Sequence, residues 1–413
     1  MIKSEEIFLK KLINKYTKEE LFENKYPLTS NPFEPQDIIK AAETLLSGRI
    51  TMSAITKKFE NEFAKFIGVK HALMVNSGSS ANLLAFFALT NPKNENKIKP
   101  NDECIIPAIC WSTSLWPIVQ AGLRPKFVDV DPKNFNLNLN ILEKNITNKT
   151  KVVLAVHILG NSTNMKKLME LIRKKNLTLI EDSCESLGSI YKNKYLGTFG
   201  KYGTYSFYVS HQITSGEGGM IVCNNTKDYR IIHALRAHGW DRGLLNKNKN
   251  NFNFINSGFN LRPLDLTAAI GMSQFKRLNF MKKVRNENRN KIVNALINSP
   301  KWKNQYTFFD PIKDLKPSWF GLPLLINRKY YKNKKKFLEY LNNNNIETRP
   351  IISGNFLNQP CIKLYNLNGN KKSFKYAQEI EDRGFFIGLH TYRLEKNNLN
   401  YLINKLLRVS DFF

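Results

Sequence analysis

Small, hydroxyl-bearing residues occur where a strand candidate runs into an apolar helical stretch, in the sequence VNSGSSANLL at residues 75–84. Gly78 and Ser79 stand where such a helix would begin, and the free backbone N–H groups of a helix N-terminus favour a phosphate. The pattern therefore indicates an anion site. An ordinary serine N-cap is the alternative explanation of the same residues.

Two carboxylates follow a buried strand candidate in LIEDSCESLGS, residues 179–189. Asp182 and Glu185 stand at the carboxyl end of that strand, which is the edge at which ligands gather in open α/β sheets. Their position favours a binding or catalytic site. A helix cap beside a surface acid is the alternative.

A lone histidine, His211, follows the hydroxyl-rich run GTYSFY and precedes a turn that contains Gly216, Gly218 and Gly219. Glycines in such a turn let the backbone approach a ligand closely or adopt a positive φ. Imidazole titrates near neutrality and is suited to moving a proton. A single histidine is nevertheless more often structural than catalytic.

Short strands in alternation with amphipathic helices must position these groups. Seven β-branched or apolar runs occupy residues 71–76, 103–109, 126–130, 151–156, 177–182, 203–208 and 219–224. Several of them are separated by stretches whose apolar residues have helical spacing, as at 165–176. This alternation predicts an α/β layer with a mainly parallel central sheet. After about residue 290, shorter strand candidates at 319–326 and 346–351 among Lys- and Asn-rich helical stretches predict a second, smaller α+β domain.

The composition is that of a globular chain with a strong positive charge. Its 413 residues are 42% hydrophobic, and 63 Lys+Arg against 34 Asp+Glu give a formal net charge of +29. In the basic run 329–341, the aromatic and leucine positions have helical spacing, which favours a solvated helix face over a nucleic-acid patch. No apolar run approaches the roughly 18 residues of a membrane-spanning helix. We expect a cytoplasmic protein that binds neither nucleic acid nor membrane.

Five cysteines are few for this length, and they are never spaced as CxxC. They are Cys104, Cys110, Cys184, Cys223 and Cys361. Their odd number and wide spacing argue against a disulfide framework or a metal site, and in favour of a reducing compartment.

The three motifs, in this order, resemble the pyridoxal phosphate (PLP)-dependent sugar aminotransferases of the DegT/DnrJ/EryC1 family, from about residue 39 to the C-terminus. The resemblance implies an α/β, aspartate aminotransferase-like fold (fold type I) with a mixed, mainly parallel seven-stranded sheet. It implies an N-terminal helical segment that packs with the small domain (1–38), a large PLP-binding domain (39–290) and a small C-terminal domain (291–413). It also implies a homodimer with the active site at the subunit interface.

The resemblance also assigns ligand contacts. Gly78, Ser79 and Ser206 would contact the cofactor phosphate, Asp182 the pyridinium nitrogen, Trp111 the cofactor ring, and Asn260 the cofactor phosphate of the neighbouring subunit. Arg349 and Glu347, in IETRPIISGNF, are candidates for binding the substrate, Arg349 through an anion of the substrate or amino donor. Three of these residues also have a structural explanation. Trp111 could be a core tryptophan, Asn260 a helix cap, and Arg349 a surface arginine.

One position departs from the aminotransferase pattern, because His211 stands where those enzymes have their Schiff-base lysine. An imidazole cannot form that bond, so PLP and pyridoxamine phosphate (PMP) would be held non-covalently. The substitution resembles the 3-dehydratases of nucleotide-linked 4-keto-6-deoxysugars. In those enzymes the histidine would remove a proton and assist the departing 3-hydroxyl. We expect Tyr208 and Glu185 to complete the catalytic set by tuning this proton transfer.

The cysteines separate two kinds of such dehydratase. The iron–sulfur kind needs four cysteine ligands, three of them clustered after a segment that reads LRAHGWDRG here, and no cysteine occurs from Asn224 to Pro360. The resemblance is therefore to the cluster-free kind, which implies a GDP-linked sugar, glutamate as amino donor, ammonia release and a role in surface polysaccharide synthesis. A sugar aminotransferase and a non-catalytic family member that has lost the lysine remain open.

Overall fold

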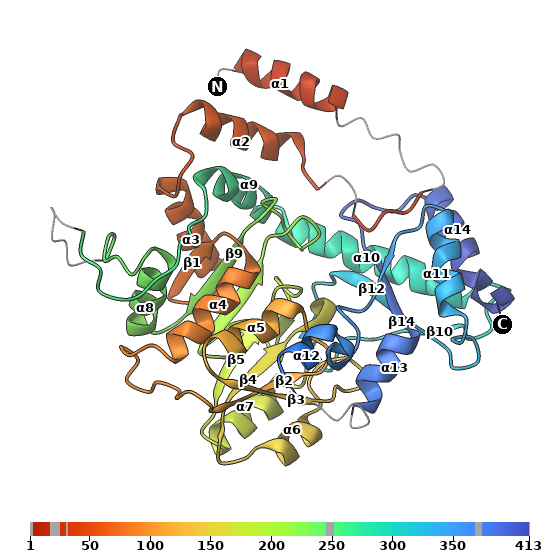
Figure 1. The fold of residues 1–413 in the computed structure, drawn as a ribbon. Coiled ribbons are helices and arrows are strands. Elements are labelled where there is room, and N and C mark those ends of the chain that lie inside the picture. The colour runs from red at the N-terminus through yellow and green to blue at the C-terminus, as the bar shows by residue number, and fades with distance from the viewer. Residues whose placement is uncertain (1–2, 17–24, 30–31, 245–251, 368–373, 413) are drawn as a thin grey trace.

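A seven-stranded sheet forms the centre of the larger part of the molecule (Figure 1). The computed structural model describes residues 3–16, 25–29, 32–244, 252–367 and 374–412. The strands are β1 (His71–Val75), β2 (Glu103–Pro107), β3 (Arg124–Val128), β4 (Thr150–Val156), β5 (Thr178–Asp182), β8 (Tyr202–Ser206) and β9 (Gly219–Cys223). Their order is β1-β9-β8-β5-β4-β2-β3, and only the pairs made by β9 are antiparallel. The expected mixed, mainly parallel seven-stranded sheet is confirmed.

Helices cover both faces of this sheet, which is why its strands read as nearly continuous apolar runs. They are α3 (Ala54–Ile67), α4 (Gly78–Leu89), α5 (Ser112–Gln120), α6 (Leu139–Asn145), α7 (Met165–Lys174), α8 (Thr226–Arg236) and α9 (Asp265–Phe275). Alternate residues of β4 face opposite sides. Val152 and Leu154 join the cluster with α4, α5 and α8, whereas Val153 and Ala155 join the cluster with α6 and α7.

A second sheet, of four antiparallel strands, organises the C-terminal part. Its order is β10 (Tyr306–Thr307), β12 (Gly321–Ile326), β14 (Gly384–Gly388) and β13 (Thr348–Arg349). Around it lie α10 (Leu278–Ile297), α11 (Lys334–Asn343), α12 (Pro360–Leu364), α13 (Lys375–Arg383), α14 (Lys396–Leu406), η2 (Phe356–Asn358) and η4 (Leu407–Phe412). The expected smaller α+β region is therefore present. The boundary expected at residue 290 falls within the continuous helix α10.

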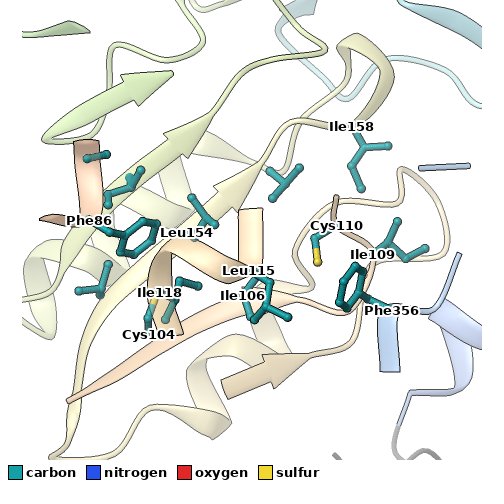
Figure 2. Close-up of a cluster of buried hydrophobic side chains, with 14 of the residues drawn as sticks. Phe86, Cys104, Ile106, Ile109, Cys110, Leu115, Ile118, Leu154, Ile158 and Phe356 are labelled. Carbon is teal, nitrogen blue, oxygen red and sulfur yellow. The ribbon is translucent and has the colours of Figure 1, made fainter. Parts of the chain in front are cut away.

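The two parts share apolar packing. Figure 2 shows Phe356 of η2 beside Ile106 of β2 and Ile109, in the same cluster as Leu115 and Ile118 of α5. A small third sheet, β11 (Leu315–Lys316), β6 (Ile190–Tyr191) and β7 (Lys194–Tyr195), also pairs the C-terminal part with the larger one. The C-terminal region is thus built into the core of the molecule rather than attached to its surface.

The N-terminal segment contains α1 (Lys3–Tyr16) and α2 (Pro35–Leu46). Of the segment expected at 1–38, residues 1–2, 17–24 and 30–31 lie outside the described residues. Tyr26 bridges to Ile346 and donates its hydroxyl hydrogen to the Gly388 carbonyl at 2.9 Å, so residues 25–29 contact the small sheet. Among the helices in the described ranges, none is long and apolar enough to cross a membrane.

Candidate active site

The first side of the site is the N-terminus of α4. Ser77 caps the helix, since its Oγ accepts a hydrogen bond from the Ser80 backbone N–H at 3.1 Å. Ser79 Oγ donates to Thr113 Oγ1 at 2.8 Å, which ties the helix to the start of α5. The serine cap and the anion site suggested by the sequence are therefore compatible, because the cap satisfies one backbone N–H and leaves the positive end of the helix dipole at this place.

The end of β8 packs directly against this helix N-terminus. A Cβ added at Gly78 would lie 2.6 Å from Ser206 Cβ and 2.9 Å from Cys184 Sγ, so only glycine fits between them. A Cβ at Gly219 would lie 2.4 Å from the Ser77 carbonyl carbon. The two glycines let β8, β9 and α4 meet, and this contact places the hydroxyl of Ser206 beside Gly78.

Asp182, at the end of β5, is 4% exposed and forms the floor of the site. Its Oδ2 accepts hydrogen bonds from Asn82 Nδ2 at 2.8 Å and from Ser114 Oγ at 2.7 Å, and its Oδ1 from the Cys184 backbone N–H at 3.2 Å. Thr204 orients Asn82 by donating to its Oδ1 at 2.6 Å. All these donors are neutral, and Asp182 forms no ion pair with any residue of the described chain. The buried carboxylate is thus held in place and can accept an N–H⁺ from a ligand.

Glu185 lies three residues after Asp182 and is partly buried. Burial, reinforced by the negative charge of Asp182, raises the pKa of Glu185 to about 8, although a hydrogen bond from the Leu159 backbone N–H at 2.9 Å opposes the rise. At neutral pH this carboxyl is therefore protonated and can donate a hydrogen. Leu159 has a φ of 52°, a left-handed conformation that is uncommon for a side chain of its size.

His211 lies in the turn after β8. Its ring packs edge-on against Phe320, with 5.1 Å between ring centroids, and its Nδ1 is buried without a hydrogen-bond partner among the described residues. Burial, with the positive charge of Arg285 nearby, lowers the pKa of His211 to about 3. The imidazole is therefore neutral at physiological pH and able to accept a proton.

A chain of contacts joins these groups. Ser206 Oγ accepts the Tyr208 backbone N–H at 3.3 Å, and the His211 backbone N–H donates to the Tyr208 carbonyl at 3.0 Å. Gln212 donates its side-chain N–H to the carbonyl oxygen of Glu185, and also to that of Ser318 at 3.1 Å. Gly78, Ser79, Asp182, Glu185, Ser206 and His211 thus belong to one connected corner of the fold.

The remaining sequence candidates lie around this corner or away from it. Trp111 and Tyr208 are 59% and 46% exposed, next to Ser112 of α5 and in the turn of His211. Asn260 is exposed and accepts from Arg262 Nε at 3.0 Å. Arg349 and Glu347 are exposed at β13, and Glu347 accepts the Leu28 backbone N–H at 3.0 Å. Within the described part of one chain, no recorded hydrogen bond or ion pair joins Asn260, Arg349 or Glu347 to Asp182, Ser206 or His211.

Four polar residues of this corner were not singled out from the sequence: Asn82, Ser114, Thr204 and Gln212. Asn82 alone carries a signal, because it stands one turn into the helix that follows the SGSS turn. The other three look like ordinary helix, strand and loop residues in the sequence, and only the fold brings them to Asp182 and Glu185.

Comparison with known proteins agrees with the family resemblance found in the sequence. The model of the DegT/DnrJ/EryC1/StrS aminotransferase family matches residues 33–407. The GDP-4-keto-6-deoxy-D-mannose 3-dehydratase of Escherichia coli O55:H7 is 37% identical over 385 residues, which are 89% of this chain and 96% of that protein.

Solved structures agree. The E. coli GDP-4-keto-6-deoxy-D-mannose-3-dehydratase with bound hydrated PLP superposes with a TM-score of 0.86 and 35% identity, over 92% of this chain and 99% of the other. A GDP-4-keto-6-deoxymannose-3-dehydratase with a trapped PLP-glutamate geminal diamine gives a TM-score of 0.85 and 35% identity, over 92% and 100% of the two chains.

Proposed function

The chain belongs to the DegT/DnrJ/EryC1/StrS aminotransferase family, and on that premise we propose that it is a PLP-dependent 3-dehydratase of a GDP-linked 4-keto-6-deoxysugar. The substrate is GDP-4-keto-6-deoxymannose and the product is the corresponding 4-keto-3,6-dideoxysugar. The observation that carries this function is His211, a neutral imidazole in the turn after β8. The sugar aminotransferases that the sequence resembles need a lysine at this position.

The residues present fit the cofactor. The N-terminus of α4, with Gly78, Ser79 and the adjacent Ser206, would hold the phosphate. Asp182 would pair with the pyridinium nitrogen, since its carboxylate is oriented by neutral donors and has no cationic partner among the residues that the structure describes. Trp111 would cover the cofactor ring. When bound, the cofactor supplies an electron sink and carries the amino group.

His211 is the base of the reaction. Its neutral ring nitrogen takes up a proton, and the resulting imidazolium returns a proton to the hydroxyl leaving C3, which departs as water. Glu185 is protonated at neutral pH and adds no negative charge beside the reacting atoms, while Tyr208 borders His211 at 6.1 Å between ring centroids. Because imidazole cannot form a Schiff base, either form of the cofactor would be held here by non-covalent contacts alone.

The redox balance requires an amino donor. Loss of the C3 oxygen reduces the sugar by two electrons, and glutamate supplies them as it is oxidised to 2-oxoglutarate. The nitrogen of glutamate leaves as ammonia. Release of ammonia consumes one water, and loss of the C3 oxygen from the sugar produces one, so the two balance. The glutamate trapped with PLP in the solved relative supports this choice of donor. Arg349 and Glu347 are our candidates for binding the substrate, and Arg349 could also take a carboxylate of the donor.

A single assay tests the proposal. Purified protein is incubated with PLP, glutamate and GDP-4-keto-6-deoxymannose, and the sugar product and ammonia are measured. We expect a 3-deoxy sugar and one ammonia for each product. A 4-amino sugar without ammonia would identify an aminotransferase instead. Absence of product with GDP-, CDP- and UDP-linked 4-keto sugars would identify a non-catalytic relative.

We further infer that two copies form the working enzyme, with the active site at their interface. Trp111 and Tyr208 beside the site, and Leu264 and Phe280 elsewhere on the chain, are large apolar side chains that one copy leaves exposed. Asn260 would reach the cofactor phosphate of the second copy. Light scattering should give twice the chain mass of 47.8 kDa, whereas a fully active monomer would contradict the shared site.

We place this reaction in the cytoplasm. All five cysteines are free thiols in the structure, and three of them are buried. Unpaired thiols are the usual state in a reducing compartment.

A further inference from the structure

Arg285, on α10, is a buried cation without a carboxylate partner in the described part of the chain. Four arginines there are buried: Arg236, Arg285, Arg289 and Arg383. Arg236 pairs with Glu60 at 2.7 Å, Arg289 with Asp310 at 3.1 Å, and Arg383 with Glu379. Arg285 alone has no recorded acid within 4.0 Å. Because an uncompensated buried charge is costly, its position calls for a function.

The guanidinium of Arg285 joins two segments that lie far apart in the sequence. Its Nε donates to the Leu389 carbonyl at 3.0 Å, just after β14, and its Nη2 donates to the His211 carbonyl at 3.2 Å. A planar guanidinium offers its donors in a fixed fork, so the two bonds set the distance between these carbonyls. The turn that carries the imidazole is thereby fixed against the C-terminal sheet.

The same charge acts on the imidazole itself. Arg285, His211, Gln212 and His390 line one cavity, and the positive charge of Arg285 adds to burial in lowering the pKa of both histidines. Other titratable groups near this cavity are Tyr208, on the turn of His211, Glu185, which is reached through Gln212, and Tyr392, whose hydroxyl lies 2.6 Å from His390 Nδ1. Glu185 is the carboxyl among these groups, and it is protonated at physiological pH, so it does not offset the guanidinium charge.

We propose that Arg285 is the positioning residue of His211: it fixes the imidazole-bearing turn through the His211 carbonyl, and its positive charge, which has no acidic partner among the described residues, adds to burial in keeping the ring neutral and proton-accepting. This role rests on the proposed function of His211 as the base. Once the ring has taken a proton, the same positive charge destabilises the imidazolium and favours its transfer to the leaving hydroxyl.

The first test measures the imidazole directly and needs no substrate. The full-length chain is labelled at the Cε1 of its six histidines, and the His211 resonance is identified by its loss in His211→Asn. We expect His211 to remain neutral at pH 6 in the wild type. In Arg285→Gln its pKa should rise by about one unit, as expected when a nearby like charge is removed. The matched control is Arg289→Gln, one turn later on α10, which should leave the His211 titration unchanged.

The second test separates charge from scaffolding. In the complete assay, Arg285→Lys keeps the charge and loses the fork, so its kcat falls while the acid limb of kcat/KM stays in place. Arg285→Gln should move that limb to higher pH. The role is overturned if wild-type His211 titrates at or above pH 6.5, or if both variants lose the same factor of activity at every pH. Because the titration is read without substrate, it can succeed even where the dehydratase assay fails, which distinguishes this inference from the proposed function.

Discussion

The imidazole of His211 and the carboxyl of Glu185 both have pKa values far from those of exposed side chains, and in opposite senses. Burial lowers the pKa of His211 to about 3 and raises that of Glu185 to about 8. Enclosure disfavours the charged form of each group. At neutral pH the corner therefore contains a proton acceptor and a proton donor that are both uncharged, which suits a reaction in which a proton moves from one carbon and a hydroxyl leaves another.

Replacing the base should stop the reaction without emptying the site. His211→Asn keeps a polar side chain of similar size but cannot take up a proton, so we expect kcat to fall by roughly 100-fold or more. Cofactor affinity should stay within about threefold, because Asp182, Ser206 and α4 are untouched. Fluorescence titration with PLP and the ammonia assay measure the two quantities. A variant that keeps wild-type kcat would contradict the role of His211.

His211→Lys gives the complementary result. A lysine at this position can bond to the cofactor aldehyde, so borohydride should fix PLP to this variant and not to the wild-type protein. The adduct is measured by the mass of the intact chain. Covalent fixation in the wild type would contradict non-covalent binding of the cofactor.

The raised pKa of Glu185 predicts the alkaline limb of activity. Above about pH 8 this carboxyl ionises and places a negative charge near Asp182, so wild-type kcat/KM should decline. Glu185→Gln resembles the protonated form and should keep most of the activity at pH 7 while losing this decline. A pH profile of kcat/KM for both proteins decides the matter, and identical alkaline limbs would exclude Glu185 as their cause.

Sequence reasoning could single out Asp182 because it ends a recognisable strand and His211 because it follows one, whereas Ser206 is assigned only through the family resemblance. It could not find the groups that orient them. Ser114 and Asn82 bind Asp182 from 68 and 100 residues away, and their types are common in any helix. Arg285 is one of several cations on α10, and only its burial makes it unusual, which a single sequence does not report.

At the scale of elements, the contact between β8 and the start of α4 depends on Gly78. Gly78→Ala places a Cβ within 2.6 Å of Ser206 Cβ, so the helix or the strand must move. Overpacking of this kind costs about 1–3 kcal/mol, and because the movement displaces the cofactor contacts we expect the Kd for PLP to rise roughly tenfold.

A second glycine is the control for this change. Gly216 has a φ of 81° and no atom within 4 Å of an added Cβ. Gly216→Ala should therefore cost about 1 kcal/mol of stability through its backbone conformation and leave the Kd for PLP nearly unchanged. Equal effects of the two substitutions on PLP binding would contradict a steric role for Gly78.

All seven strands of the large sheet could be predicted, because each is a short apolar run bounded by turns or helices. The β6–β7 hairpin could not. Its strands have two residues each, and its turn consists of Lys192 and Asn193 with φ of 46° and 66°, which carries no glycine to mark it. The boundary between the two sheets could not be predicted either, because it falls in α10 and nothing in the 20 residues of this helix interrupts the helical pattern.

For the whole molecule, enclosed histidines predict how stability depends on pH. Burial lowers the pKa of His211 and His233 to about 3 and that of His390 to about 4. Between about pH 4 and 6.5 the unfolded chain therefore binds protons that the native chain excludes, so the free energy of unfolding rises with pH. Glu185 has the opposite effect between its ordinary pKa and about pH 8, because the native chain keeps a proton that the unfolded chain loses. This one carboxyl does not outweigh the three histidines.

Urea unfolding at pH 5.0 and 6.5 tests this expectation, and the midpoint should be higher at pH 6.5. His233→Asn, on α8 and outside the site, should reduce the difference between the two midpoints. Equal midpoints for the wild type at both pH values would show that the histidines do not govern acid stability. The formal charge of +29 works in the same direction, since protonation at low pH adds to an existing self-repulsion.

The place of Phe356 in the apolar cluster of the large sheet (Figure 2) has a consequence for how the chain is made. The ribosome releases the seven-stranded sheet first, but Phe356, Ile351 and Phe386 of its apolar cluster are synthesised more than 120 residues after β9 ends at Cys223. A nascent chain that stops near residue 300 therefore exposes apolar surface of this cluster, and chaperones bind such surface. We therefore expect this cluster to close only after nearly all of the sequence has emerged from the ribosome.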